Sequence, residues 1–255
     1  MTETGIHYLD ASGPDGMRLY AIGDVHGRHD LLAAMHRQIV SELEYASASD
    51  WRIIHLGDYV DRGPDSRSVI DFLIEAQKRD PRNIMLAGNH DVGFLEFLAD
   101  AEPDGLFMNY GGMQTAQSYG VDLARDAHWF GKAEAVRRGH AALVKAVPRS
   151  HVDFLRSLTF SATFGDFFFC HAGIRPGVPL DHQNQQDLIW IRDAFHDHPG
   201  LFSKVIVHGH TPVAEAEVMA NRVNVDTLAW KSGMLSALAV NGGDKRILTV
   251  QGNAL

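Results

Sequence analysis

The sequence predicts a protein of the α/β class. In its N-terminal part, three short apolar segments alternate with amphipathic segments whose apolar residues recur with the period of a helix. This alternation is typical of strands joined by helices in a parallel sheet. Towards the C-terminus, short apolar segments follow one another with only turn residues between them. Such segments leave no room for helical crossovers, so we expect antiparallel strands there.

Length and composition are those of a folded domain. The chain has 255 residues, of which 45% are hydrophobic and 22% charged, so residues 1–255 are predicted to form a single domain. The formal net charge of −9 argues against nucleic acid as the main partner, because nucleic-acid binding requires a basic face. No apolar run approaches the ~18 residues of a membrane span. The polar segment Met1–Gly16 lacks the basic and apolar regions of a signal peptide.

Cysteine usage indicates the redox compartment. Cys170 is the single cysteine of the sequence, which excludes an internal disulfide and fits a reducing compartment. A cytoplasmic location is therefore expected. Cys170 itself is expected to be a small buried hydrophobic residue.

The first predicted strand, Met17–Ile22, is followed by two residues that suit a metal. Asp24 and His26 are two positions apart, so on an extended segment their side chains point the same way. The alternative is that Asp24 caps the following helix. That helix is predicted over 30–45, where apolar residues recur every three or four positions.

The second strand ends the same way. Ile53–Leu56 suits a buried strand, and the loop after it carries Asp58, Asp61 and Arg62. Two carboxylates and a guanidinium therefore follow a strand end, which is where α/β proteins place their chemistry. The alternative is that these residues form only a polar turn with a local ion pair. An amphipathic helix is expected over 66–78.

The third strand, Asn83–Ala87, ends in Gly88, Asn89 and His90, and a helix is expected over 92–99. Residues that can bind a metal have now followed a strand three times. Chance would scatter them along the chain, whereas the carboxyl ends of parallel strands meet at one edge of a sheet. The repetition favours a site over three unrelated turns.

The alternation of strand and polar loop stops between the third and fourth strands. Helical patterns occur around Thr115–Tyr119 and Lys132–Val147. We predict a helical cap insertion at about 103–150 that shapes the mouth of the site. An ordinary layer of packed helices is the alternative.

Two later strands again end in histidines. Asp166–Cys170 is followed by His171, and Ser203–Val207 is followed by His208 and His210. His208 is expected to lie behind the site rather than in it. The segments 216–225, 235–240 and 247–250 are the short strands for which antiparallel pairing is expected.

Six strand-end residues offer oxygen or imidazole nitrogen as ligands: Asp24, His26, Asp58, Asn89, His171 and His210. These donors suit Mn²⁺, Fe or Zn²⁺, with Mn²⁺ preferred. Six ligands exceed the needs of one tetrahedral ion, so a pair of ions sharing Asp58 fits better. Two ions about 3.5–4 Å apart can hold a hydroxide and clamp the attacking and leaving oxygens of phosphoryl transfer.

Phosphoryl transfer needs two further groups. Arg62 and Arg192 are the candidates for a positive clamp on the phosphate. His90 is placed to protonate the leaving oxygen, and Asp61 could orient it and raise its pKa.

Five sequence blocks resemble the calcineurin-like metallophosphoesterases, and more narrowly the compact bacterial and phage branch of the phosphoprotein phosphatase family. The blocks are G-D-V-H-G (23–27), G-D-Y-V-D-R-G (57–63), G-N-H-D (88–91), H-A-G (171–173) and G-H-T-P (209–212). The resemblance runs from about Met17 to the C-terminus. It implies a β-sandwich core flanked by helices, with a dinuclear metal site at the strand ends.

The resemblance also implies a role for each residue. Asp24 and His26 match ligands of the first metal and Asp58 the bridging ligand, while Asn89, His171 and His210 match ligands of the second. His90 matches the general acid, Asp61 its partner, and Arg62 and Arg192 the phosphate-binding arginines. Asp91 and Ala172 depart from the Glu and Gly of the eukaryotic branch, and the surroundings of Arg192 vary within the family. The block N-V-D-T (224–227) resembles bacterial members that include symmetrical diadenosine tetraphosphate hydrolases.

The sequence therefore leads to the hypothesis of a phosphomonoesterase with two divalent metal ions. A metal-bridging hydroxide would attack phosphorus directly, and the substrate would be a phosphoprotein carrying phosphoserine, phosphothreonine or phosphotyrosine. One alternative is a dinucleoside polyphosphate hydrolase, which would cleave an anhydride. A remote alternative is a non-catalytic phosphoprotein-binding protein with the same fold.

Overall fold

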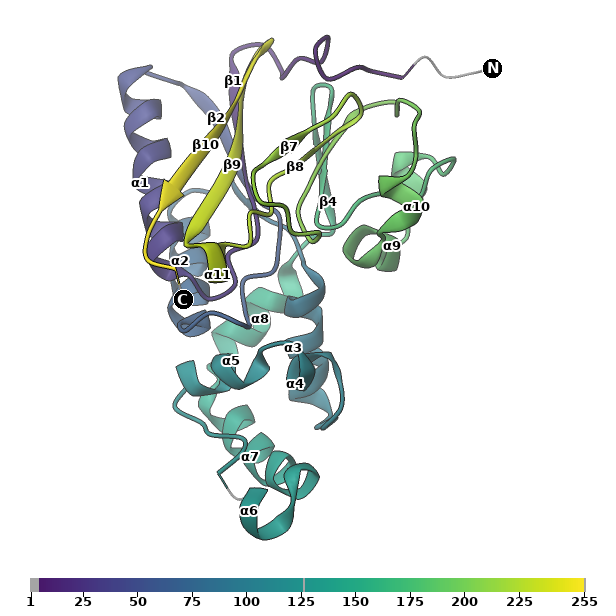
Figure 1. Ribbon diagram of the computed structural model, residues 1–255. Coiled ribbons are helices and arrows are strands. Elements are labelled where there is room, and N and C mark those ends of the chain that lie inside the picture. The colour runs from purple at the N-terminus through teal and green to yellow at the C-terminus, as the bar shows by residue number, and fades with distance from the viewer. Residues whose placement is uncertain (1–4, 126, 255) are drawn as a thin grey trace.

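The computed structural model describes residues 5–125 and 127–254, and in these residues two five-stranded sheets pack face to face with helices on both outer faces (Figure 1). This arrangement confirms the α/β class and the β-sandwich flanked by helices. The first sheet has the order β10-β9-β1-β2-β3, formed by β1 (Met17–Ile22), β2 (Asp50–His55), β3 (Asn83–Met85), β9 (Met234–Asn241) and β10 (Asp244–Gln251). The second has the order β4-β5-β6-β8-β7, formed by β4 (Ser161–Phe164), β5 (Phe167–Cys170), β6 (Val205–His208), β7 (Glu217–Val218) and β8 (Arg222–Asn224).

Strands β1, β2 and β3 are parallel and adjacent, as the sequence predicts. Ile22 lies opposite His55, and His55 lies opposite Met85, so the three strands end level with one another. The connecting helices are α1 (His29–Tyr45), α2 (Ser66–Arg79) and α3 (Asn89–Ala99), which follow β1, β2 and β3 in turn. The loops that carry the predicted ligands therefore open at a single edge of the sheet.

In the second sheet, β5, β6 and β8 are parallel, and they end at the same edge of the sandwich. Strand β4 was not predicted. It forms an antiparallel hairpin with β5 through a turn at Gly165. The expected antiparallel pairing of the C-terminal strands is confirmed for β7 with β8 and for β9 with β10. Strand β8 also pairs with β6, which is parallel to it, and this pairing was not predicted.

Successive apolar side chains of a strand point to opposite faces of its sheet, which explains why both faces are covered. Leu19 and Ala21 of β1 point between the sheets, where they meet Phe167 and Phe169 of β5. The intervening Tyr20 points to the helices on the outer side of the first sheet. Burial of each large apolar side chain stabilises the fold by about 1.5–3 kcal/mol relative to exposure. The two sheets are thereby held in one orientation, which fixes their strand ends against each other.

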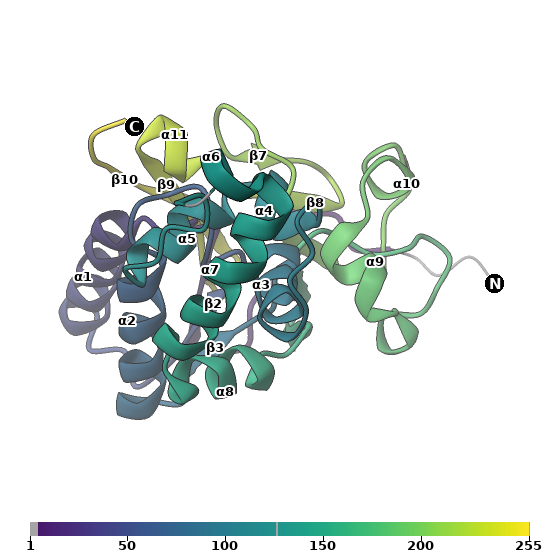
Figure 2. The same cartoon turned by 90° about the horizontal axis from the view of Figure 1, so that it is seen from below.

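Helices cover the two outer faces unequally. Figure 2 shows α1 and α2 on one side of the sheets, and α9 (Gln185–Trp190) and α10 (Asp193–His196) on the other. The segment predicted as a cap forms α4 (Leu106–Asn109), α5 (Gly112–Ser118), α6 (Ala127–Phe130) and α7 (Lys132–Ala146), and α8 (Arg149–Ser157) follows it. In Figure 1, α6 and α7 lie farthest from the sheets. Its role as a cap insertion stays a prediction.

Two short helices complete the structure: η1 (Leu180–His182) before α9, and α11 (Ala229–Ser232) before β9. Among the described residues, no helix is both long and apolar enough to cross a membrane.

Candidate metal centre

The structure brings the six predicted ligands together at the common edge of the two sheets. They follow five different strands: Asp24 and His26 after β1, Asp58 after β2, Asn89 after β3, His171 after β5 and His210 after β6. Each is at most 5% exposed. His26, Asp58, Asn89 and His210 line a cavity of about 520 Å³, and Asp24 and His171 lie behind this lining.

The Asp58 carboxylate lies at the centre of the group. The Nε2 atom of His26 is 3.4 Å from one of its oxygens, Oδ2, and the Nε2 atom of His171 is 3.4 Å from the other, Oδ1. The two sheets thus contribute one imidazole each to opposite oxygens of the same carboxylate.

Neither imidazole has a proton to offer to Asp58. The Nδ1 atom of His26 lies 2.7 Å from the carbonyl oxygen of Val60, and that of His171 lies 2.9 Å from the carbonyl oxygen of Leu56. A carbonyl only accepts hydrogen bonds, so both Nδ1 atoms carry the hydrogen. Burial lowers the pKa of both rings, which keeps them neutral. Each Nε2 atom therefore points a lone pair at the carboxylate.

Further electron-rich atoms meet at His171. Its Nε2 atom lies 3.0 Å from Oδ1 of Asn89 and 3.2 Å from Nδ1 of His210. A lone pair, an amide oxygen and a carboxylate oxygen repel one another unless a cation lies between them. Backbone contacts at the Nδ1 atoms of metal-binding histidines orient the rings in this way. The donor set therefore fits a divalent cation on each side of Asp58, with Asp24 and His26 on one side and Asn89, His171 and His210 on the other.

Distances between ligand atoms identify two groups of residues that could hold a metal ion. One contains Asp58, His171 and His210, and the other contains His26, Asp58 and His90. Both share Asp58, as the predicted bridging role requires. The second group includes His90 in place of the predicted Asp24.

Asp24 lies on the far side of the site, beside a buried carboxylate that the sequence analysis did not identify. Its carboxylate accepts a hydrogen bond from the backbone N–H of His210 at 3.1 Å and contacts the carboxyl group of Asp226. Burial raises the pKa of Asp24, and the carboxylates of Asp226 and Asp58 add to this effect. Burial also raises the pKa of Asp226, to about 6. Asp226 comes two residues after β8, so the rule of polar residues after strand ends could have found it.

Several site residues have a strained backbone. Seven residues other than glycine have a positive φ angle among those described, and five of them are predicted site residues: His26 (43°), Asp58 (53°), Asp61 (71°), Arg62 (67°) and His210 (66°). Such conformations cost about 1–3 kcal/mol each and persist where the surrounding structure imposes them. Because these conformations are concentrated at the site, the fold holds these side chains in place at a cost in folding stability.

The buried carboxylate of Asp91 fixes the loop after β2. It accepts hydrogen bonds from the backbone N–H groups of Asp58 (2.8 Å), Tyr59 (2.9 Å) and Gly88 (2.9 Å). One side chain at the start of α3 thus joins the loops after β2 and β3. Asp91, where the eukaryotic branch has Glu, is long enough to make all three contacts.

His90 and Asp61 form the predicted pair. The Nδ1 atom of His90 lies 2.7 Å from Oδ2 of Asp61, and the other oxygen of Asp61 accepts a hydrogen bond from Thr115 of α5 at 2.8 Å. Burial alone would lower the pKa of His90, but the Asp58 carboxylate and the hydrogen bond to Asp61 raise it above its ordinary value. Asp61 is fully buried, so turning the ring would leave its Oδ2 atom without this partner.

The two predicted arginines line the same cavity as the ligands. One Nη atom of Arg62 lies 3.1 Å from Nε2 of His90, and its guanidinium lies over the ring of Trp230, 5.7 Å from the ring centre. Arg192 follows α9 and reaches the cavity from the second sheet. The mouth is completed by Asp104, Leu106, Asn109, Tyr110 and Trp190.

Two residues set aside in the sequence lie outside this cavity. His208 is buried, and its ring packs edge to face against Phe195 at 5.1 Å. Cys170 lies in the apolar cluster on the outer side of the second sheet, where burial raises the pKa of its thiol. Neither residue is placed to act on a substrate in the cavity.

This arrangement of ligands agrees with the family to which the chain is similar. The model of the calcineurin-like phosphoesterase family matches residues 17–242, so the chain belongs to this family. The protein is accordingly a phosphoester hydrolase, and its His and Asp clusters fit the divalent metal ions that the family implies.

Relatives of known name differ in substrate. Serine/threonine-protein phosphatase 2 of Salmonella typhimurium is 22% identical over 242 residues, covering 91% of this chain and 96% of its own length. Bis(5′-nucleosyl)-tetraphosphatase PrpE (asymmetrical) of Anoxybacillus flavithermus is 25% identical over 247 residues, covering 85% of this chain and 88% of its own length. A solved structure described as a candidate diadenosine tetraphosphatase shares the fold, with a TM-score of 0.60, 19% identity and coverage of 92% of this chain and 93% of that chain.

We predict that Asp58→Asn removes stoichiometric metal, because the amide takes away the one negative charge that both sides of the site share. Metal content would be measured by plasma mass spectrometry after dialysis of protein loaded with Mn²⁺. Asn tolerates the positive φ angle at this position, so the backbone is not an additional cause of loss.

Asp104→Asn is the matched control, since it makes the same chemical change at the mouth of the same cavity. It should keep the metal content of the unaltered protein. Normal metal content in a folded Asp58→Asn variant would contradict the bridging role of Asp58.

Proposed function

We propose that the protein is a metal-dependent phosphomonoesterase that removes phosphate from phosphoserine, phosphothreonine or phosphotyrosine side chains of proteins. The family supplies the reaction class, and the residues around the cavity are the reason for choosing a monoester. Mn²⁺ is the metal we expect, with Fe or Zn²⁺ as alternatives that the same donors accept.

The observation that carries the proposal is the charge on the cavity wall. Arg62 and Arg192 are the two cationic side chains among its described lining residues, and the one acidic residue at its mouth is Asp104. Two guanidinium groups match the oxygens of one phosphoryl group. A tetraphosphate chain would carry further negative charges. No other cation of the lining pairs with them, and Lys132 beside the cavity is already in an ion pair with Asp104 at 3.4 Å.

The chain's own residues account for binding and proton transfer. When bound, two divalent ions would supply an activated water molecule and neutralise charge on the phosphate. Arg62 and Arg192 would hold the phosphate oxygens. Arg62 now donates to Nε2 of His90, and turning to a phosphate would free this nitrogen to carry the proton for the leaving oxygen. Asp61 keeps the His90 ring in place throughout.

One observation favours dinucleoside polyphosphates as the second candidate. Tyr110 and Trp190 both line the cavity, and Tyr110 is 56% exposed, so an aromatic surface is available for a nucleobase. The names of several relatives also refer to dinucleotide substrates. An anhydride has a good leaving group, so this reaction would depend less on His90.

Steady-state kinetics with added Mn²⁺ test the choice of substrate. The substrates are a phosphoserine peptide, a phosphotyrosine peptide and diadenosine tetraphosphate. We expect kcat/KM for at least one peptide to exceed that for the dinucleotide by about tenfold or more. The reverse order would assign the dinucleotide to this cavity, and trace turnover of all three by the fully metal-loaded protein would support the non-catalytic alternative.

We also predict that His90→Asn lowers kcat by about 10²–10⁴ on a phosphoserine peptide, the usual contribution of a general acid. The loss should be smaller on p-nitrophenyl phosphate, whose leaving group needs little protonation. His182→Asn makes the same change at an exposed histidine and should leave both rates unaltered. Equal losses on the two substrates would remove His90 from the role of acid.

A further inference from the structure

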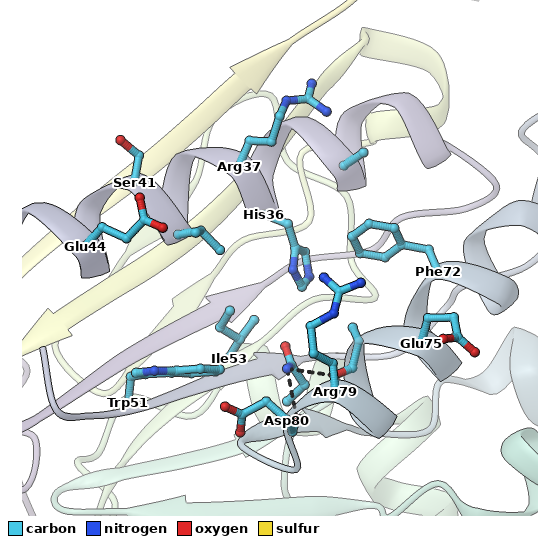
Figure 3. Close-up of a pocket in the computed structure, with 14 residues that line it drawn as sticks. His36, Arg37, Ser41, Glu44, Trp51, Ile53, Phe72, Glu75, Arg79 and Asp80 are labelled. Atoms are coloured by element: carbon cyan, nitrogen blue, oxygen red, sulfur yellow. Dashed lines mark hydrogen bonds between the residues drawn. The ribbon is translucent and has the colours of Figure 1, made fainter.

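A second cavity lies on the opposite side of the first sheet from the sandwich core, between α1, α2 and the strands β2 and β3 (Figure 3). Its volume is about 520 Å³, close to that of the cavity at the metal centre, and the two share no lining residue. A volume of this size lies in the usual range for sites that bind small molecules.

The walls are apolar and include two aromatic rings. Figure 3 shows Trp51 on one side and Phe72 on the other, with Ile53 of β2 on the floor of the same cavity. Val40 of α1 also lines it and is half-exposed. Arg82 covers the Trp51 ring, its guanidinium 4.3 Å from the ring centre, and the Phe72 ring packs edge to face against His36 at 4.8 Å. Side chains held in this way present flat surfaces, which suit a planar aromatic ligand.

A buried acceptor in the lining has no partner. Asn83 is 6% exposed, and its amide nitrogen donates to the backbone carbonyls of Ala76 (3.2 Å) and Asp80 (3.0 Å) at the end of α2. These two acceptors fix the orientation of the amide, and its Oδ1 atom makes no hydrogen bond. An unsatisfied buried acceptor costs about 1–3 kcal/mol. Because Oδ1 is itself enclosed, Asn83 contributes a fixed wall to the cavity and no open acceptor.

The histidine in the lining does not provide a charge. His36 points into the cavity in Figure 3, and its Nε2 atom lies 3.2 Å from Nε2 of the buried His55. One of the two rings must donate to the other, and burial lowers the pKa of His36 to about 4. His36 therefore adds a neutral, flat surface, and any charge recognition depends on the rim.

The rim carries two arginines without an acidic partner. In the described part of the chain, neither Arg37 nor Arg79 lies within 4.0 Å of a carboxylate oxygen, as an ion pair would require. The neighbouring acids are in part already paired, Asp80 with Arg82 at 2.6 Å and Glu75 with Lys78 at 3.0 Å, which leaves Glu44. Figure 3 shows the Arg79 guanidinium directed towards His36, above the apolar walls.

We propose that this cavity binds a small planar aromatic anion. The ring lies between Trp51 and Phe72, and the anionic group pairs with Arg79. This site is independent of the proposed phosphatase activity, because the two cavities have no lining residue in common.

The experiment uses two fluorescent probes that differ in one charged group. 1-Anilinonaphthalene-8-sulfonate is an aromatic anion built on a planar naphthalene ring, and N-phenyl-1-naphthylamine is the same molecule without the sulfonate. Each would be titrated into the metal-loaded full chain, with isothermal calorimetry giving the stoichiometry. We expect one site per chain for the sulfonate, unchanged by saturating inorganic phosphate, which we expect to bind at the metal centre instead.

Two variants locate the site. Arg79→Gln should weaken sulfonate binding about five- to tenfold and leave the neutral probe within about twofold, because only the charged interaction is lost. Arg137→Gln on α7 is the matched control and should change neither. Ala33→Phe fills the cavity and should abolish binding of both probes, and Ala76→Phe replaces it if the first variant does not fold.

Three results would overturn the proposal. The first is that the intact protein does not bind the sulfonate, and the second is that phosphate displaces it. The third is that Arg79→Gln and the folded cavity-filling variant both bind the sulfonate as tightly as the unaltered chain does.

Discussion

The structure depends on a repulsive arrangement at Asp58. Both carboxylate oxygens face the lone pair of a neutral imidazole, His26 on one side and His171 on the other. Backbone carbonyls hold the only hydrogens of these rings on their far sides. Without cations, the Asp58 oxygens and these Nε2 atoms meet in a buried space where water screens their repulsion only weakly. The fold must therefore hold these groups together at the expense of stability, and bound metal ions would return that stability as binding energy.

Much of the surrounding structure can be understood as the means of holding this arrangement. The two sheets bury a common apolar layer, so loops from five strands reach one edge in a fixed relation. Asp91 joins the loop after β2 to the start of α3 through three backbone N–H groups. Gly88 and Gly209 are required by close approach, since a Cβ atom at these positions would collide with the carboxylates of Asp58 and Asp24. Positive φ angles at His26, Asp58 and His210 lie in the same loops.

The sequence predicted most strands and the parallel pairing of β1, β2 and β3, but it missed other long-range contacts. Strands β1, β2, β3, β5 and β6 were predicted because each is an apolar run that ends in a glycine or histidine, which needs no knowledge of the rest of the chain. The parallel pairing of β8 with β6 depends on the path of a loop, and no local pattern encodes it. For the same reason the contact of Thr115 with Asp61 and that of Trp230 with Arg62 were not expected, as they join segments far apart in the sequence. Asp226 did follow a predicted strand, but nothing in its own segment showed that it faces Asp24.

The central claim is that Asp58 bridges two metal ions, and crystals grown with Mn²⁺ test it most directly. Anomalous diffraction data collected at the manganese edge would show the ions without relying on activity. We expect two peaks about 3.5–4 Å apart, one near Asp24 and His26 and the other near Asn89, His171 and His210, with Asp58 between them. A single peak, or two peaks of which one lies beyond reach of Asp58, would contradict this account of the site.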